Sequence, residues 1–280
     1  MIVREVHAQL NNMGGRGVTS VTPLSTRSNV SGGARVTPSG GSGEVDFLQT
    51  KIATASGSNE GGVYRGSDGV ERYVKFYKDP TQAYGEALAN SIYKDLGIDA
   101  PVSRVFTTKD GKVAFASDMV KNTKPIGYPS VTSNVAKQIM NGYAADVLLS
   151  KRDVVGLVND NIRLNNGKVV RIDNGASFLH RAMGTRKAES DLNDISELNY
   201  FIKSSTQYAP IARRAGITSP QSMGKDLNRQ VNVITRLRNK YGTWDKYVKV
   251  KLPKWTGADR NRVVEMLEAR TSKLRKIIEK

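Results

Sequence analysis

The most constraining feature of this sequence is a pair of carboxylates on either side of a short hairpin. Asp153 lies in a loop after an apolar-striped stretch, and Asn161 stands at the start of a β-rich run. An Asn-Asn-Gly turn and a second β-rich run complete the hairpin, and Asp173 follows directly. This order predicts that Asp153, Asn161 and Asp173 meet at one cleft edge. Asn and Asp oxygens are hard ligands suited to Mg²⁺, and a loop carboxylate can accept or orient a hydroxyl proton.

Three upstream features add the remaining parts of a phosphoryl-transfer site. Lys75 lies in an apolar strand-like run, and Glu86 follows eleven residues later in a predicted helix. A buried lysine needs a carboxylate partner, and a strand lysine paired with a helix glutamate is how kinases hold phosphates. The Gly/Ser-rich turn 56–62 lies just upstream, where small residues let backbone N–H groups approach phosphate oxygens.

The flanking patterns predict a small sheet with one inserted helix, followed by a mostly helical remainder. Strands are expected at 51–56, 62–64, 70–77, 102–107 and 112–117, and the inserted helix between Asp79-Pro80 and Gly97. Beyond these we expect a helix over 133–150, strands at 162–164 and 168–172, and helices near 191–204, 207–214, 219–241 and 257–279.

Composition narrows the classes of protein further. The chain has no cysteine and only two histidines, which excludes disulfides and leaves little for a His-based metal site or triad. No run of about 18 apolar residues occurs, so we expect no membrane span and a cytoplasmic protein. Residues 14–43 contain eighteen Gly, Ser or Thr, so the first 50 residues are predicted to be a disordered segment.

The formal net charge of +17 is concentrated near the C-terminus. Residues 225–280 hold sixteen Lys or Arg against six Asp or Glu. A nucleic acid or an acidic partner could bind this basic helical region. A solvated helical face is an equally good interpretation, because charge runs are unspecific.

Several motifs together resemble the HipA-like kinases and the related phosphoinositide-kinase-like branch, and most of all small kinase-like domains of phage-encoded or secreted bacterial proteins. In the C-terminal half these motifs are Asp153-Val-Val-Gly-Leu157, Asp160-Asn161, Arg171-Ile-Asp-Asn-Gly175 and Arg181-Ala-Met-Gly184. The upstream matches are Gly61-Gly-Val-Tyr64, Tyr73-Val-Lys-Phe76, Glu86-Ala-Leu-Ala-Asn90 and Pro101. The resemblance covers roughly residues 52–190.

This resemblance implies an α+β, bilobal protein-kinase-like fold that uses ATP and Mg²⁺. Residues 51–120 would form the small β-rich N-lobe with one helix, and residues 121–280 the mostly helical C-lobe. Asp153 would be the catalytic aspartate, and Asn161 and Asp173 the magnesium ligands. Glu86 would hold Lys75 on the ATP phosphates. The other expected nucleotide contacts are Ser58, Asn59, Gly61 and Gly62 in the turn, and Asp118, Met119 and Val120 at the hinge after Ser117.

One departure from the family leaves two alternatives for the metal-binding amide. Many relatives carry this Asn five residues after the catalytic Asp, whereas Asn161 is eight after Asp153 and Asn159 is six after. We favour Asn161 because Ile162-Arg163-Leu164 continues as the expected strand. Ser56 and Ser58 lie where some relatives phosphorylate their own nucleotide loop. Two interpretations of Arg181, which follows His180, are equally good: a contact to phosphate or to the acceptor, and a surface arginine without such a role.

The expected activity is transfer of the γ-phosphate to Ser or Thr of an unidentified protein, and perhaps of the chain itself. The chain would then be a phage protein or a delivered effector that acts in a host cytoplasm. Two alternatives remain open: AMP transfer on the same fold, and a basic nucleic-acid-binding or virion protein with a pseudokinase domain.

Overall fold

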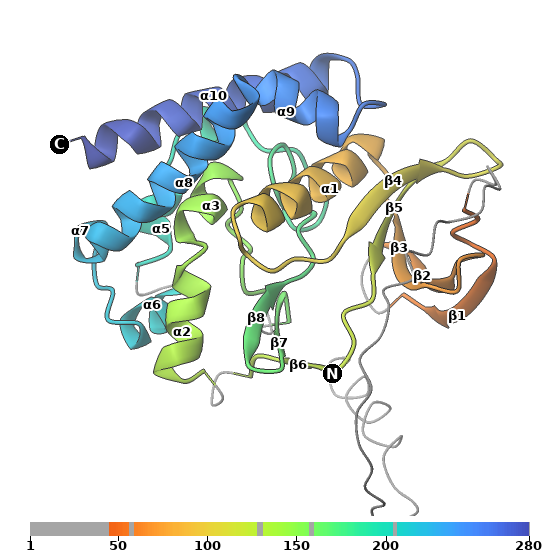
Figure 1. Cartoon of the computed structure of the whole chain (residues 1–280), viewed down its shortest axis with the longest axis horizontal. Coiled ribbons are helices and arrows are strands. Elements are labelled where there is room, and N and C mark those ends of the chain that lie inside the picture. The colour runs from red at the N-terminus through yellow and green to blue at the C-terminus, as the bar shows by residue number, and fades with distance from the viewer. Residues whose placement is uncertain (1–44, 56–58, 128–130, 157–159, 204–205, 280) are drawn as a thin grey trace, which may run out of the picture. The chain divides into compact units, whose positions relative to one another are not determined.

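The computed structural model describes residues 45–55, 59–127, 131–156, 160–203 and 206–279 (Figure 1). Most of the segment predicted to be disordered therefore lies outside the described residues. So do Ser56 and Ser58 of the glycine-rich turn, and Asn159, the alternative metal ligand.

The N-terminal part is a five-stranded antiparallel sheet with the order β1-β2-β3-β5-β4. Its strands lie close to the predicted positions because β-branched and aromatic residues are frequent in them. They are β1 Thr50–Thr54, β2 Glu60–Arg65, β3 Glu71–Phe76, β4 Ser103–Thr107 and β5 Val113–Asp118. The prediction of a small sheet is confirmed.

One helix, α1 Pro80–Asp95, connects β3 to β4, as predicted. It begins where it does because Asp79 caps it, accepting a hydrogen bond from the Thr81 N–H at 3.0 Å, and because Pro80 fits the first turn. It ends before Gly97, whose φ of 77° lies in the left-handed region. The helix packs against β3, β4 and β5 on one side and against α9 on another (Figure 1).

The C-terminal part combines a three-stranded antiparallel sheet with nine helices among the residues described. The sheet has the order β6-β7-β8, with β6 Thr123–Pro125, β7 Ile162–Asn165 and β8 Lys168–Arg171. The helices are α2 Ser133–Met140, α3 Tyr143–Leu148, α4 Glu189–Asn193, α5 Glu197–Tyr200, α6 Ala209–Arg214, α7 Pro220–Met223, α8 Lys225–Tyr241, α9 Trp244–Lys251 and α10 Ala258–Ile278. The largely helical character of this part agrees with the prediction.

The single helix expected over 133–150 is interrupted, so that prediction was wrong in detail. Gly142 separates α2 from α3. A Cβ at this position would lie 2.3 Å from the Arg171 guanidinium, which donates hydrogen bonds to the Ile139 carbonyl and to both oxygens of Asp146. The chain turns here to enclose a buried arginine, which helical periodicity does not reveal.

Other helix boundaries also differ from the sequence prediction. The stretch 219–241 divides at Gly224, which has a φ of 43°. The described residues of 191–204 contain only the end of α4 and the short α5. Helix α9 was not predicted. Thr243 caps it by accepting a hydrogen bond from the Lys246 N–H. Trp244 and Tyr247, which lie just inside the helix, are fully buried. Strand β6 was also missed because it contains a proline.

Apolar residues of the basic C-terminal region are part of the main hydrophobic core. Val231 of α8, Trp244 of α9 and Leu267 of α10 are fully buried in one cluster that also contains Leu88 of α1. Within the part of the chain that the structure describes, no helix has the length and apolar character needed to cross a membrane.

Candidate active site

A cavity of ≈ 470 Å³ is lined by residues of the five-stranded sheet, α1, and the loops around β7 and β8. Nine residues singled out from the sequence line it: Asn59, Lys75, Glu86, Asp118, Met119, Val120, Asp153, Asn161 and Asp173. The structure thus brings together side chains that lie up to 114 positions apart in the chain.

Lys75 contacts two of the carboxylates that line this cavity. Its Nζ lies 2.9 and 3.2 Å from the two carboxylate oxygens of Glu86 and 2.7 Å from Asp173 Oδ1. Burial by itself would lower the pKa of Lys75, but Glu86 and Asp173 outweigh it and hold the pKa well above its usual range. The lysine is therefore a permanent cation at neutral pH.

Glu86 is fixed by two further contacts. The Tyr77 hydroxyl donates a short hydrogen bond to Oε2, and the Asn174 backbone N–H donates to Oε1 at 3.0 Å. Gly175 permits this approach, because a Cβ there would lie 2.4 Å from the Tyr77 hydroxyl. Helix α1, β3 and the segment after β8 therefore meet at one buried carboxylate.

Asp153 and Asn161 form a second polar unit of the cavity. The Asn161 amide donates to the Asp153 backbone carbonyl at 3.1 Å and to Asp153 Oδ2 at 3.2 Å. The turn between them uses Gly156 in the left-handed region, and the Asn161 N–H donates to the Val155 carbonyl. Burial raises the pKa of Asp153, with Lys151 and Asn161 opposing the rise. A carboxylate with a raised pKa is a better proton acceptor.

Asp173 differs from Asp153 in charge state and exposure. It follows β8 with a φ of 50°, and its side chain is 54% exposed at the cavity. The charge of Lys75, partly opposed by burial, lowers the pKa of Asp173. The surroundings therefore push the two pKa values apart, down for Asp173 and up for Asp153, which suits a metal ligand and a proton acceptor respectively.

The oxygen atoms suited to a divalent cation come from Asn161 and Asp173. Because the Asn161 nitrogen donates to Asp153, its side-chain oxygen remains as the acceptor. No cluster of three or more His, Cys, Asp or Glu side chains in metal-binding arrangement occurs among the described residues. The donor set is thus small, hard and oxygen-only, which fits Mg²⁺ that keeps water or phosphate oxygens as further ligands.

The two glycines of the predicted phosphate loop lie inside β2 and not in a turn, and neither lines the cavity. Gly61 and Gly62 have φ values of 148° and 153°. A Cβ on Gly61 would lie 2.0 Å from the Val74 carbonyl, and one on Gly62 would lie 2.2 Å from that of Ala53. Close packing of the strands therefore explains both glycines, and of the predicted loop residues that the structure describes, only Asn59 lines the cavity.

The predicted hinge lies along the same cavity. The Asp118 carboxylate accepts from Arg72 Nε at 2.9 Å, and the Met119 N–H donates to the Glu71 carbonyl at 3.0 Å. In the described part of the chain the Val120 N–H has no hydrogen-bond partner. It is thus available to a ligand at this edge.

Lys151 is a functional candidate that the sequence analysis missed. It is fully buried, and its Nζ donates to Asn174 Oδ1 at 2.5 Å, which fixes the residue next to Asp173. Burial lowers its pKa to about 8, against the attraction of Asp146, Asp173 and Asp153. A lysine two positions before Asp153 was the available signal.

His180 and Arg181 lie outside the cavity lining. His180 Nε2 is 3.0 Å from Asp79 Oδ2, and Arg181 donates to Asp191 Oδ2 at 2.6 Å. Both side chains therefore tie the segment after β8 to neighbouring helices.

The fold has counterparts among solved structures. The chain is similar to a Helicobacter pylori proinflammatory kinase, CtkA, with 17% identity, coverage of 83% of this chain and 96% of that chain, and a TM-score of 0.51. Weaker similarity extends to the N-terminal 618-residue fragment of Legionella pneumophila LepB, with 15% identity, coverage of 77% and 46%, and a TM-score of 0.39. No protein-family model and no curated protein sequence matches the chain.

The fold is accordingly that of the protein-kinase-like proteins, an N-terminal five-stranded sheet with one helix followed by a largely helical part. At 17% identity this similarity establishes the fold and no more.

Proposed function

We propose that the chain is an ATP- and Mg²⁺-dependent kinase that transfers the γ-phosphate to a Ser or Thr hydroxyl of a protein. The observation that carries the proposal is the position of Lys75. Its ammonium is held by Glu86 from α1 and faces Asp173, in a cavity that Asp153 and Asn161 also line. Phosphoryl transfer requires these groups and little more from a protein.

We assign the following roles to the residues that line the cavity. Lys75 would bind phosphate oxygens, with Glu86 keeping it in place, and the free Val120 N–H would hydrogen-bond the base. Asn161 and Asp173 would hold the metal ion, which when bound neutralises charge on the phosphate oxygens. Asp153, whose pKa is raised by burial, would accept the proton of the attacking hydroxyl.

The HipA-like assignment is part of the proposal. Its support is the set of motifs from Asp153 to Gly175, together with a kinase-like fold. The choice of a protein acceptor rests on the same resemblance, and so does the role of a phage or effector protein.

A labelling experiment tests the proposal. The chain is incubated with Mg²⁺ and ATP labelled on the γ- or the α-phosphate, with a generic protein acceptor, beside Asp153→Ala and Asp173→Ala. We expect label from γ-labelled ATP only, and a loss of about 10²-fold or more in each variant, because Asp153→Ala removes the proton acceptor and Asp173→Ala removes a metal ligand. Asp110→Asn, which changes an exposed carboxylate between β4 and β5 that does not line the cavity, is the matched control and should label normally.

Other results would redirect the assignment. Label from α-labelled ATP would indicate AMP transfer. Nucleotide binding without any label would indicate a pseudokinase, and no nucleotide binding at millimolar ATP would contradict the proposal altogether.

A further inference from the structure

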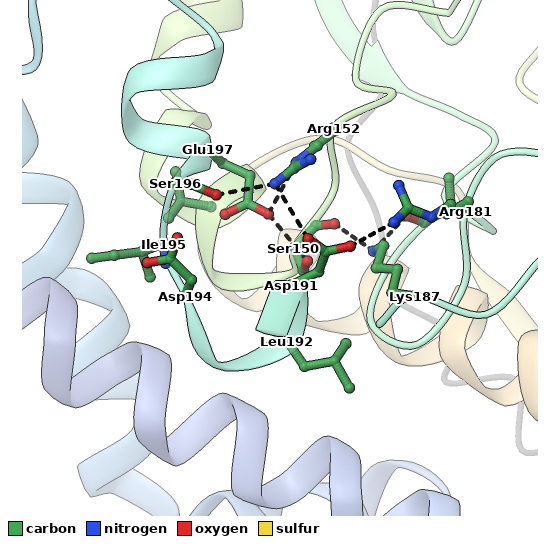
Figure 2. A network of polar contacts seen from close by, with 12 residues as sticks. Ser150, Arg152, Arg181, Lys187, Asp191, Leu192, Asp194, Ile195, Ser196 and Glu197 are labelled. Atoms are coloured by element: carbon green, nitrogen blue, oxygen red, sulfur yellow. Dashed lines mark hydrogen bonds and ion pairs between the residues drawn. The ribbon is translucent and has the colours of Figure 1, made fainter. Parts of the chain in front are cut away.

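Lys187 joins the two loops that carry Asp153 and Asp173. Its Nζ donates hydrogen bonds to the backbone carbonyl of Ser150 at 2.5 Å and to that of Ala176 at 3.2 Å. Ser150 lies three residues before Asp153, and Ala176 three residues after Asp173. Figure 2 shows Lys187 beside Ser150. One side chain, from a third segment, therefore bridges both halves of the candidate active site.

Both bridged carbonyls belong to buried residues, and one of these residues has an uncommon backbone conformation. Ser150 is 1% exposed and has a φ of 52°, an uncommon conformation for a residue with a side chain. Ala176 is also buried. A buried carbonyl needs a donor, so removing the Lys187 ammonium would release two backbone groups next to the catalytic residues.

Lys187 is surrounded by a cluster of charged side chains that we call the basic cluster. Its basic members are Arg152, Arg181 and Arg270, and its acidic members are Asp191 and Glu197. Figure 2 shows Arg152, Arg181, Asp191 and Glu197 near Lys187. Arg270 of α10 lies 3.0 Å from Glu197 of α5, and Arg181 donates to Asp191 of α4 at 2.6 Å.

Arg152 completes this network. Its Nη2 donates to Ser196 Oγ at 3.0 Å, and its Nε lies 3.7 Å from Glu197 Oε1. Three guanidinium groups thus share two carboxylates, and Lys187 adds a fourth positive charge without a carboxylate of its own among the described residues.

The charge of Lys187 is therefore sensitive to pH near neutrality. Burial lowers its pKa to about 7, helped by the positive charge of Arg270 and opposed by Glu197; Arg152 and Arg181 lower it further. This value lies in the range where most proteins work, whereas an ordinary lysine stays charged up to about pH 10.

We propose that Lys187 is a positioning residue whose ammonium holds the Ser150–Asp153 and Asp173–Ala176 loops in the arrangement needed for phosphoryl transfer, and that loss of its proton loosens them. The proposal rests on the kinase function proposed above. A charged donor makes the stronger hydrogen bond, so the positioning effect is largest below the pKa and declines above it.

Kinetics of three variants test this role. Lys187→Met should lower kcat about 10- to 100-fold, the cost of a small misplacement at an active site, with KM for ATP little changed. Lys187→Arg keeps a positive donor, so it should retain more activity than Lys187→Met and lack the decline in activity that we expect of the wild type between pH 6.5 and 8.5. The exposed Lys137→Met on α2 is the matched control.

Two measurements need no kinase activity. Amide hydrogen exchange in residues 150–156 and 173–177 should be faster in Lys187→Met than in the wild type. NMR titration of ¹³C-labelled lysines, assigned by comparison with Lys187→Arg, should show one Cε signal titrating near pH 7.

These results separate the two proposals. A wild type without activity but with faster exchange in Lys187→Met contradicts the kinase function and leaves the bridge standing. Unchanged exchange in a folded Lys187→Met protein overturns the bridge, and a kcat equal to that of the wild type overturns its role in positioning the catalytic residues. A Lys187 signal that titrates only near pH 10 overturns the pH dependence.

Discussion

Lys75 carries a positive charge into an apolar strand, and two carboxylates from distant segments neutralise it. Glu86 is 2% exposed, so its charge is tolerated only while Lys75, Tyr77 and the Asn174 N–H all contact it. At the scale of residues the candidate site is therefore a coupled set of charges, and a change in one leaves another without its partner.

Lys75→Met should destabilise the fold as well as abolish activity. Removing one partner of a buried ion pair costs about 3–5 kcal/mol, because the remaining charge stays buried. Lys75→Met combined with Glu86→Gln should regain part of this free energy of unfolding, since no charge is left alone. Urea unfolding curves measure both values, and a double variant no more stable than the single one would contradict this account.

Helix ends and breaks position the elements that surround the cavity. Asp79 starts α1 and accepts hydrogen bonds from Thr81, His180 and Arg186. Arg186 also reaches Asp259 of α10, at 2.6 Å. The start of α1 is thereby tied both to the segment after β8 and to the last helix. At the break between α2 and α3, Gly142 leaves space for the Arg171 side chain.

Acid should weaken the anchor of α1. Burial raises the pKa of Asp79, but hydrogen bonds from His180, Arg186 and the Thr81 N–H prevail and lower it from 3.8 to about 2. The folded pKa is depressed, so its stabilising contribution, about 2 kcal/mol at most, is present above pH 3.8 and lost as pH falls through 2. Asp79→Asn should therefore reduce the free energy of unfolding at pH 6 and have little effect near pH 2. An equal effect at both pH values would contradict the assignment.

Two glycine substitutions in helical surroundings should act in opposite directions. Gly142→Ala places a methyl 2.3 Å from the Arg171 guanidinium and should destabilise by about 1–3 kcal/mol through overpacking. Gly85→Ala lies inside α1, where the new Cβ meets Phe178 at an ordinary 3.6 Å. It should stabilise by about 0.5–1 kcal/mol, the helix penalty of glycine. Thermal unfolding of both variants checks the signs, and destabilisation by Gly85→Ala would show that α1 is packed more tightly than described.

On the scale of the whole molecule, the basic C-terminal region is part of the folded body. Val263, Leu267 and Leu274 of α10 are fully buried, and Arg270 reaches Glu197 in the interior. A nucleic acid or an acidic partner could still contact the exposed lysines and arginines of α8, α9 and α10. That interaction remains a prediction, which salt-dependent binding would test.

Truncation of the chain before α10 should therefore abolish cooperative folding. Removing residues 258–280 uncovers the apolar residues that this helix buries. We expect loss of a sharp unfolding transition and increased binding of a hydrophobic dye. Lys276→Glu changes an exposed charge of the same helix and should leave the transition unchanged. A truncated chain that still unfolds cooperatively would show that α10 is dispensable.

Local sequence patterns were enough to predict the sheet, α1 and the convergence of Asp153, Asn161 and Asp173 on one cleft. Runs of β-branched and aromatic residues, helix caps and turns are all encoded by residues that are neighbours in the chain. The pairing of Lys75 with Glu86 was also predictable, since a lysine in an apolar strand needs an acid. The roles of these residues in catalysis remain predictions.

Contacts between distant residues decided the rest. The break at Gly142 depends on Arg171, the glycines of β2 on carbonyls of neighbouring strands, and the bridge made by Lys187 on two backbone oxygens 37 and 11 positions away. Nothing near these residues in the chain indicates such partners. The surroundings of a side chain form only when the chain folds, and these surroundings lower the pKa of a lysine such as Lys187.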